Sequence, residues 1–174
     1  DKVSKFLQNL GASVKLKGGW YGIFFFLIYL WLNGQSKMCP KTVVQNKIIL
    51  DTTVPLVPPK VARVQLPEYG SVAKKTQELL GNEVRVVSAF QNVAAIHLNG
   101  DDALSGEVLV FGNNKDAREI IIGLIEQIGM KGWHAGSIDN SVVAESMTSV
   151  LIFMNKFYNM EGAGINIVDS SINH

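Results

Sequence analysis

Apolar positions in the second part of the chain occur either in short continuous runs or at helical spacing. The runs at residues 47–51, 84–90 and 107–112 predict strands, because interior strands of a parallel sheet are apolar on both faces. Residues 71–80 and 114–128 have helical spacing, and the first of these segments begins with a good N-cap residue. The order strand, helix, strand, strand, helix predicts a right-handed βαβ arrangement around a mainly parallel sheet.

The longest amphipathic pattern lies at residues 141–159, after a short edge strand that ends near residues 133–136. Near-regular i, i+4, i+7 spacing predicts a helix with one apolar side. We expect that side to pack in the core or against a second copy of the chain, because such stripes are more often packing surfaces than ligand contacts. Its members are Val143, Met147, Val150, Leu151, Met154, Phe157 and Tyr158. Residues 164–168 then alternate like a small final strand.

These elements predict an α/β fold: an incomplete Rossmann-like, doubly wound, mainly parallel sheet with a C-terminal amphipathic helix. Ligands of such sheets lie beyond the carboxyl ends of the strands, which selects the loops at residues 51–58, 88–97 and 134–140. We expect the three loops to meet at one edge and to form half of a dry cleft. Most of their polar side chains are small and carry hydroxyl or amide groups: Thr52, Thr53, Ser88, Gln91, Asn92, Ser137 and Asn140.

The three loops pair no nucleophile with an obvious base, and the acidic residues near them are widely spread. His97 and His134 are lone histidines, which are more often structural or surface residues than proton shuttles. Hydride transfer suits such walls, because the cofactors carry that chemistry while the protein stacks two rings and excludes water. We therefore expect neither a catalytic acid or base nor a metal site.

The charge balance narrows the choice of partners. Sixteen basic against fifteen acidic residues, without a run of like charge, provide no electrostatic footprint for nucleic acid or an acidic membrane surface. The single cysteine cannot form an internal disulfide, so an oxidising compartment is not implied and the cytoplasm is expected.

The apolar and aromatic run at residues 20–32 does not fit the pattern of the rest of the chain. It is short for a membrane span, which needs roughly 20 apolar residues. Three interpretations stay open: a buried strand with irregular flanking sequence, non-native sequence from a truncated or frameshifted reading frame, and a membrane or signal element.

Four blocks of the chain, residues 47–59, 86–92, 134–140 and 145–151, occur in an order that resembles the NADPH-dependent reductases of coenzyme F-420. The resemblance covers roughly residues 46–168. It is specific, because four ordered blocks are stronger than a lone motif, although related dinucleotide-binding reductases share parts of it.

The resemblance implies a cytoplasmic enzyme, often a homodimer, that moves a hydride between C4 of NADP and C5 of the deazaflavin coenzyme F-420. It places Val54 and Ala95 next to the nucleotide and the nicotinamide. From their loop positions we expect Thr53, Pro55, Asn92, Val93 and Ala94 to line the same cleft, and His134 and Asn140 to shape the deazaflavin pocket.

The chain departs from the family pattern before residue 46. The Gly-rich turn that holds a pyrophosphate at a helix N-terminus is absent, because no Gly-x-Gly-x-x-Gly stretch occurs in the sequence. A Ser-Arg pair for the 2′-phosphate is absent before residue 20. We therefore expect residues 1–45 to be an irregular remnant of the nucleotide-binding half and residues 46–168 to be a Rossmann-like reductase domain, together a truncated member of doubtful activity. The alternatives are a non-enzymatic dimerisation or deazaflavin-binding module, and a membrane-associated protein anchored by residues 20–32.

Overall fold

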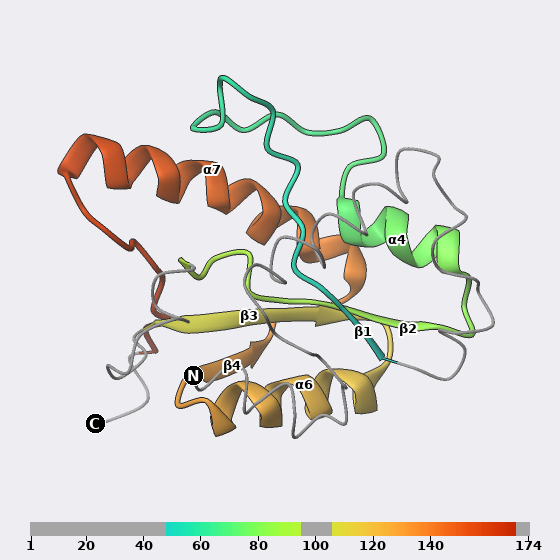
Figure 1. Ribbon diagram of the computed structural model, residues 1–174. Helices are drawn as coiled ribbons and strands as arrows, with labels where there is room; N and C mark the ends of the chain where they lie inside the picture. Colours follow the sequence, from blue (N-terminus) through green and yellow to red (C-terminus); the bar gives the residue numbers. More distant parts are fainter. Residues whose placement is uncertain (1–47, 95–105, 170–174) are drawn as a thin grey trace, which may run out of the picture.

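The computed structural model describes residues 48–94 and 106–169, which form one sheet with helices on both faces (Figure 1). The sheet has the order β1-β2-β3-β4. Its strands are β1 (Ile48–Asp51), β2 (Arg85–Ser88), β3 (Glu107–Gly112) and β4 (Lys131–His134). The helices are α4 (Val72–Leu80), α6 (Lys115–Gln127), the short 3-10 helix η2 (Ile138–Asn140) and α7 (Ser141–Tyr158). The predicted α/β class and the predicted order of elements are confirmed.

The pairing of the strands divides the sheet into two halves. β1 is parallel to β2 and β3 is parallel to β4, but β2 and β3 are antiparallel. Two of the three pairings are therefore parallel, which confirms a mainly parallel sheet. The expectation that all three loops follow strands of one direction is wrong for the third loop, because β4 runs opposite to β1 and β2. The antiparallel strands β2 and β3 pair at their carboxyl-terminal residues, Val87 with Gly112 and Ser88 with Phe111.

Helices cover both faces of the sheet (Figure 1). The helix α6 covers one face, where Ala117, Ile121 and Ile125 pack in a core cluster with strand residues such as Val87 and Val110. The helices α4 and α7 lie over the other face, where Ala73 and Leu80 of α4 form a second cluster. This cluster is completed by Val84, Val86 and Ile138.

Side chains cap the starts of two helices, and the sequence predicts the first of these caps. The Ser71 side chain accepts a hydrogen bond from the amide of Lys74 at the start of α4. The Asn114 side chain accepts one from the amide of Ala117 at the start of α6. Such caps satisfy amides that have no partner inside the helix, and each stabilises the helix by about 1 kcal/mol.

The helix α7 buries a different face from the one predicted. Its buried residues are Ser141, Ala144, Glu145, Ser149 and Leu151. Most of these side chains are small and allow a close approach to the sheet. The predicted apolar side is largely exposed, with Val143 53%, Val150 47%, Phe157 68% and Tyr158 62% accessible. These four residues therefore do not pack in the core, and their packing against a second copy of the chain stays a prediction.

The segment that follows α7 forms no strand, so the predicted strand at residues 164–168 is wrong. It nevertheless contacts the start of β3. The amide of Glu107 donates to the carbonyl of Ile165 at 2.9 Å, and the amide of Ile167 donates to Oε2 of Glu107 at 2.6 Å. The segment therefore bonds β3 once through its backbone and once through the Glu107 side chain, and not through a regular series of backbone hydrogen bonds.

No helix within residues 48–94 and 106–169 is long and apolar enough to cross a membrane. The predictions for residues 1–45, including the run at residues 20–32, lie outside the described residues.

Candidate functional site

The carboxyl ends of β1 and β2 lie side by side. Asp51 and Ser88, the last residues of the two strands, are partners in the parallel ladder. The side-chain amide of Gln91 donates to the Asp51 carbonyl at 3.0 Å and to the Ser88 hydroxyl at 2.8 Å. The loops at residues 52–71 and 89–94 therefore leave the sheet as neighbours, as the sequence predicts for these two of its three loops.

The first loop is held by the buried carboxylate of Asp51. Its Oδ1 accepts from the Thr53 amide at 2.9 Å and from the Thr53 hydroxyl at 2.5 Å. Thr53 is buried, whereas Val54 and Pro55 are half-buried. The Thr53 hydroxyl is therefore committed to the turn, and Val54 and Pro55 supply the apolar surface of this loop.

The second loop is held by Asn92, which is 1% exposed. Its side-chain amide donates to the Glu107 carbonyl at 2.6 Å, and its Oδ1 accepts from the Leu109 amide at 3.4 Å. Asn92 thus bonds β3 where the backbone ladder with β2 has ended. Its amide is committed to β3, and Val93 and Ala94, both half-buried, supply the surface of this loop.

A sharp turn connects β2 to this second loop. Phe90 has a φ of 73°, which is sterically unfavourable for a bulky side chain. Its carbonyl accepts from the amide of Val93 at 3.1 Å. Backbone strain persists where the surroundings over-determine a conformation, and it is concentrated at functional sites. The side-chain bonds of Gln91 and Asn92 provide that constraint.

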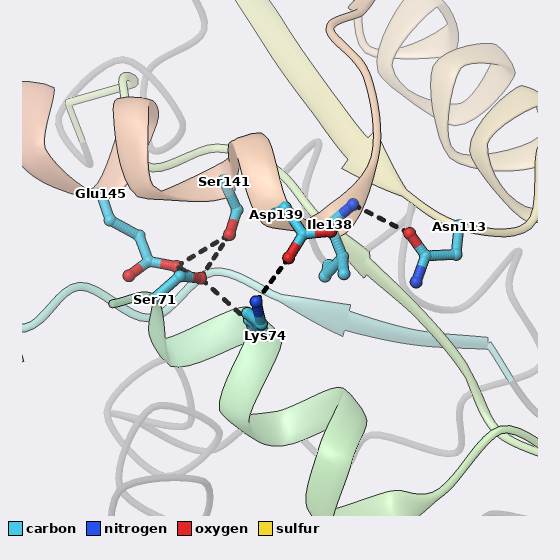
Figure 2. A network of polar contacts seen from close by, with 7 residues as sticks. All are labelled: Ser71, Lys74, Asn113, Ile138, Asp139, Ser141 and Glu145. Carbon is cyan, nitrogen blue, oxygen red and sulfur yellow. Dashed lines mark hydrogen bonds and ion pairs between the residues drawn. The ribbon is translucent and has the colours of Figure 1, made fainter. Parts of the chain in front are cut away.

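A buried polar network joins α7 to the end of the first loop (Figure 2). Oε1 of Glu145 accepts from the Ser71 hydroxyl at 2.8 Å, the Ala73 amide at 3.1 Å and the Ser141 hydroxyl at 3.2 Å. Oε2 accepts from the Val72 amide at 2.8 Å. The Ser71 and Ser141 hydroxyls also share a hydrogen bond of 2.5 Å. Glu145 therefore occupies the N-terminus of α4.

Two opposing effects act on the Glu145 carboxyl. Burial raises its pKa above the ordinary value of 4.5, and the nearby Asp51 carboxylate acts in the same direction. Hydrogen bonds from Val72, Ala73 and Ser71 act against this rise. Since a carboxylate of the protein already caps α4, this helix N-terminus is not open to a phosphate group.

The third predicted loop follows β4, which runs opposite to β1 and β2, and the Gly136 carbonyl in this loop accepts from the Gly112 amide at 3.2 Å. Nδ1 of His134 accepts from the amide of Gly136 at 3.1 Å, and the Asn140 side chain donates to the Ala135 carbonyl at 3.2 Å. Both side chains therefore bond the backbone of their own turn. That His134 and Asn140 shape the same cleft as Val54 and Asn92 stays a prediction, and Ala95 and His97 lie outside the described residues.

The partly exposed residues of the first two loops suit a flat ring better than a phosphate group. Val54, Pro55, Val93 and Ala94 are partly exposed, small and uncharged, as a surface that stacks against an aromatic ring should be. Among residues 48–94 and 106–169 there is no cluster of His, Cys, Asp and Glu that could hold a metal. A small open hollow of about 200 Å³ is lined by Gly106, Gly162, Gly164, Ile165 and Asn166, none of which belongs to these two loops.

Comparison with known proteins identifies the relatives of this chain. It is 36% identical over 137 residues to an F420-dependent NADP reductase of Methanocaldococcus jannaschii, and the match covers 76% of this chain and 61% of that protein. It is 30% identical over 133 residues to a protein of the same name from Methanothermobacter thermautotrophicus, covering 72% and 57%. The chain thus spans less than two thirds of the length of these relatives.

Solved structures support the fold. A crystal structure from Arthrobacter sp. FB24, described as that of an F420-dependent NADP reductase, matches with a TM-score of 0.67 at 19% identity, over 82% of this chain and 66% of that one. At that identity the match shows a shared fold. No protein-family model matches the chain.

Proposed function

We propose that this chain, which belongs to the family of F420-dependent NADP reductases, provides part of a cleft for hydride transfer between NADP(H) and coenzyme F-420. One observation carries the proposal: two loops with small, uncharged and partly exposed residues lie side by side at the carboxyl ends of parallel strands. That is where α/β sheets bind their ligands.

The residues of the two loops have separate roles in this proposal. Val54 and Pro55 form one wall and Val93 and Ala94 the other, while the nicotinamide and deazaflavin rings supply the hydride chemistry. Thr53 and Asn92 hold the walls through their bonds to Asp51 and β3. Ala95, which follows directly, is proposed to approach the nicotinamide.

The pyrophosphate of NADP needs donors that these walls do not provide. The N-terminus of α4 is capped by Glu145, and the sequence contains no Gly-x-Gly-x-x-Gly turn. Several charge-assisted hydrogen bonds, each worth about 1.5 to 3 kcal/mol, would be missing. We therefore expect no measurable NADPH binding by the 174-residue chain in a calorimetric titration, and a micromolar dissociation constant would contradict this expectation.

A chimera tests the activity itself. A segment with a Gly-x-Gly-x-x-Gly turn, which the family resemblance implies before residue 46, would be joined to residue 46 of this chain. The oxidation of NADPH by coenzyme F-420 would be followed by deazaflavin absorbance. We expect turnover by the chimera and none by the 174-residue chain. A folded chimera that binds neither cofactor would refute the proposed cleft.

The same chimera distinguishes the enzyme from a binding module. Quenching of deazaflavin fluorescence without NADPH oxidation would favour a non-enzymatic module.

We further propose that the protein is cytoplasmic and forms a homodimer through the exposed side of α7. On that side the rings of Phe153 and Phe157 stack at 5.6 Å, and Phe157 is 68% exposed.

A further inference from the structure

One helix contacts both loops of the proposed cleft. Glu145 of α7 bonds the residues that end the first loop and begin α4. Thr148, one turn further along α7, donates from its hydroxyl to the Gln91 carbonyl in the second loop at 2.7 Å. Residues three apart lie on the same side of a helix, so the two anchors share one face of α7.

The first anchor is the Glu145 carboxyl group, which accepts hydrogen bonds from the start of α4. The Ser71 hydroxyl accepts from the Lys74 amide and so can donate its proton to Glu145. The amides of Val72 and Ala73 can only donate. An ionised carboxylate accepts all these bonds and lies at the positive end of the α4 dipole. The Glu145 side chain is 2% exposed, so few waters can replace these partners.

The charged groups around Glu145 come from three elements. Asp51 of β1 repels its carboxylate. Lys74 of α4 is engaged at 2.7 Å with Asp139 of η2, and both of these side chains are about half exposed. The positive charge of Lys74 is therefore already paired, and the bonds to the start of α4 are what hold Glu145.

We propose that Glu145 and Thr148 are positioning residues, which set the separation of the two loops from a single helix. The geometry stands by itself, whereas the purpose of this separation rests on the proposed function. A plain helix cap would order the start of α4 alone. A shared support also transmits a change at one loop to the other, because both bonds start from the same rigid face of α7.

Amide hydrogen exchange measured by NMR on the whole chain tests the anchors directly. In Glu145→Gln, the Val72 and Ala73 amides should exchange roughly ten to a hundred times faster relative to the core amide of Val87. In Thr148→Val, the Val93 amide should exchange faster by a smaller factor. Thr148→Ser should restore it, and Ser146→Ala is the matched control because Ser146 takes no part in these contacts.

The signature of positioning is the cross-effect. Glu145→Gln should also shift the backbone resonances of Val93 and Ala94, and Thr148→Val should shift those of Val72 and Ala73. If each substitution affects its own loop alone, Glu145 is a local cap and the proposal is wrong. If Glu145→Gln does not fold, the Thr148→Val and Thr148→Ser pair still decides between the two outcomes.

The pH dependence provides a second readout. Because the pKa of folded Glu145 lies above its unfolded value of 4.5, the folded chain holds this proton more tightly. Its contribution to stability is complete below pH 4.5 and is lost as the pH rises through the folded pKa. Wild type should therefore lose stability relative to Glu145→Gln over that window, while the Val72 and Ala73 amide resonances move with the same titration.

The pH effect of Glu145 is separate from that of Asp139. The ion pair with Lys74 lowers the pKa of Asp139 below 3.8, so that its contribution is lost only as the pH falls further. Amide resonances of Val72 and Ala73 that stay constant above pH 4.5 would contradict the raised pKa of Glu145, and the anchor itself is decided by the exchange rates and the cross-effect. An inactive chimera with intact anchors would refute the proposed function and leave the geometry standing.

Discussion

Asn92 provides a sharp test of how the second loop is held. Its amide bonds the Glu107 carbonyl at 2.6 Å and its Oδ1 accepts from the Leu109 amide at 3.4 Å, so one side chain extends the contact between β2 and β3. Replacing Asn92 by Ala removes both bonds at a position that is 1% exposed. The two backbone groups of β3 then lose their partners.

The expected cost follows from those groups. Loss of a hydrogen bond costs about 0.5 to 1.5 kcal/mol, and a buried donor left without a partner costs about 1 to 3 kcal/mol. The Leu109 bond is long and Leu109 is only half-buried, which reduces its share. We expect Asn92→Ala to lower the free energy of unfolding by roughly 2 kcal/mol, a large fraction of a typical domain stability of about 5 to 15 kcal/mol.

Urea unfolding followed by circular dichroism measures this loss. The matched control is Asn140→Ala, which also removes one asparagine amide but at an exposed position with a single bond to its own turn. We expect the control to change the free energy of unfolding by less than about 0.5 kcal/mol. Equal effects of the two substitutions, with unchanged denaturant slopes, would refute the bridging role of Asn92.

Two further predictions concern the packing of the sheet and the exposed side of α7. A Cβ at Gly112 would lie 2.9 Å from the Val86 carbonyl oxygen, so Gly112→Ala should lower the free energy of unfolding in urea by about 1 to 3 kcal/mol. A Cβ at Gly123 in α6 meets free space, so Gly123→Ala should raise the free energy of unfolding. A change of the same sign in both variants would contradict this packing. Phe157→Glu should weaken self-association in sedimentation velocity while Lys156→Ala should not, and a wild type that stays monomeric at high concentration would rule out the proposed dimer.

Much of the fold was predictable because local signals agree with it. Apolar runs mark β1, β2 and β3, the cap at Ser71 marks the start of α4, and helical spacing marks α6. The direction of β3 was not predictable from its pattern. A strand with both faces buried has the same run of apolar residues whether its neighbour is parallel or antiparallel, so the antiparallel pairing of β2 and β3 leaves no mark in either strand.

The buried face of α7 was missed for a different physical reason. Periodicity of large apolar residues indicates the face with the most hydrophobic area, and in α7 that face is exposed. Burial instead follows the small residues Ser141, Ala144 and Ser149, which let the helix approach closely. Glu145 lies among them, and a lone glutamate in a helix pattern predicts a solvated position. Its spacing from a capping serine on another helix is a tertiary property that local patterns do not contain.

The described part of the chain supplies only some walls of the proposed cleft. A hydride passes between two rings only when both are held face to face, which requires walls on both sides. In the proposed cleft, residues 52–55 and 92–94 are neighbouring walls at the carboxyl ends of β1 and β2. We expect the remaining walls to come from the rest of the chain or from a second copy. An added front end supplies donors for a pyrophosphate but leaves Val54 and Val93 in place, so substitutions of these two residues in the chimera should weaken cofactor binding without changing the stability of the sheet.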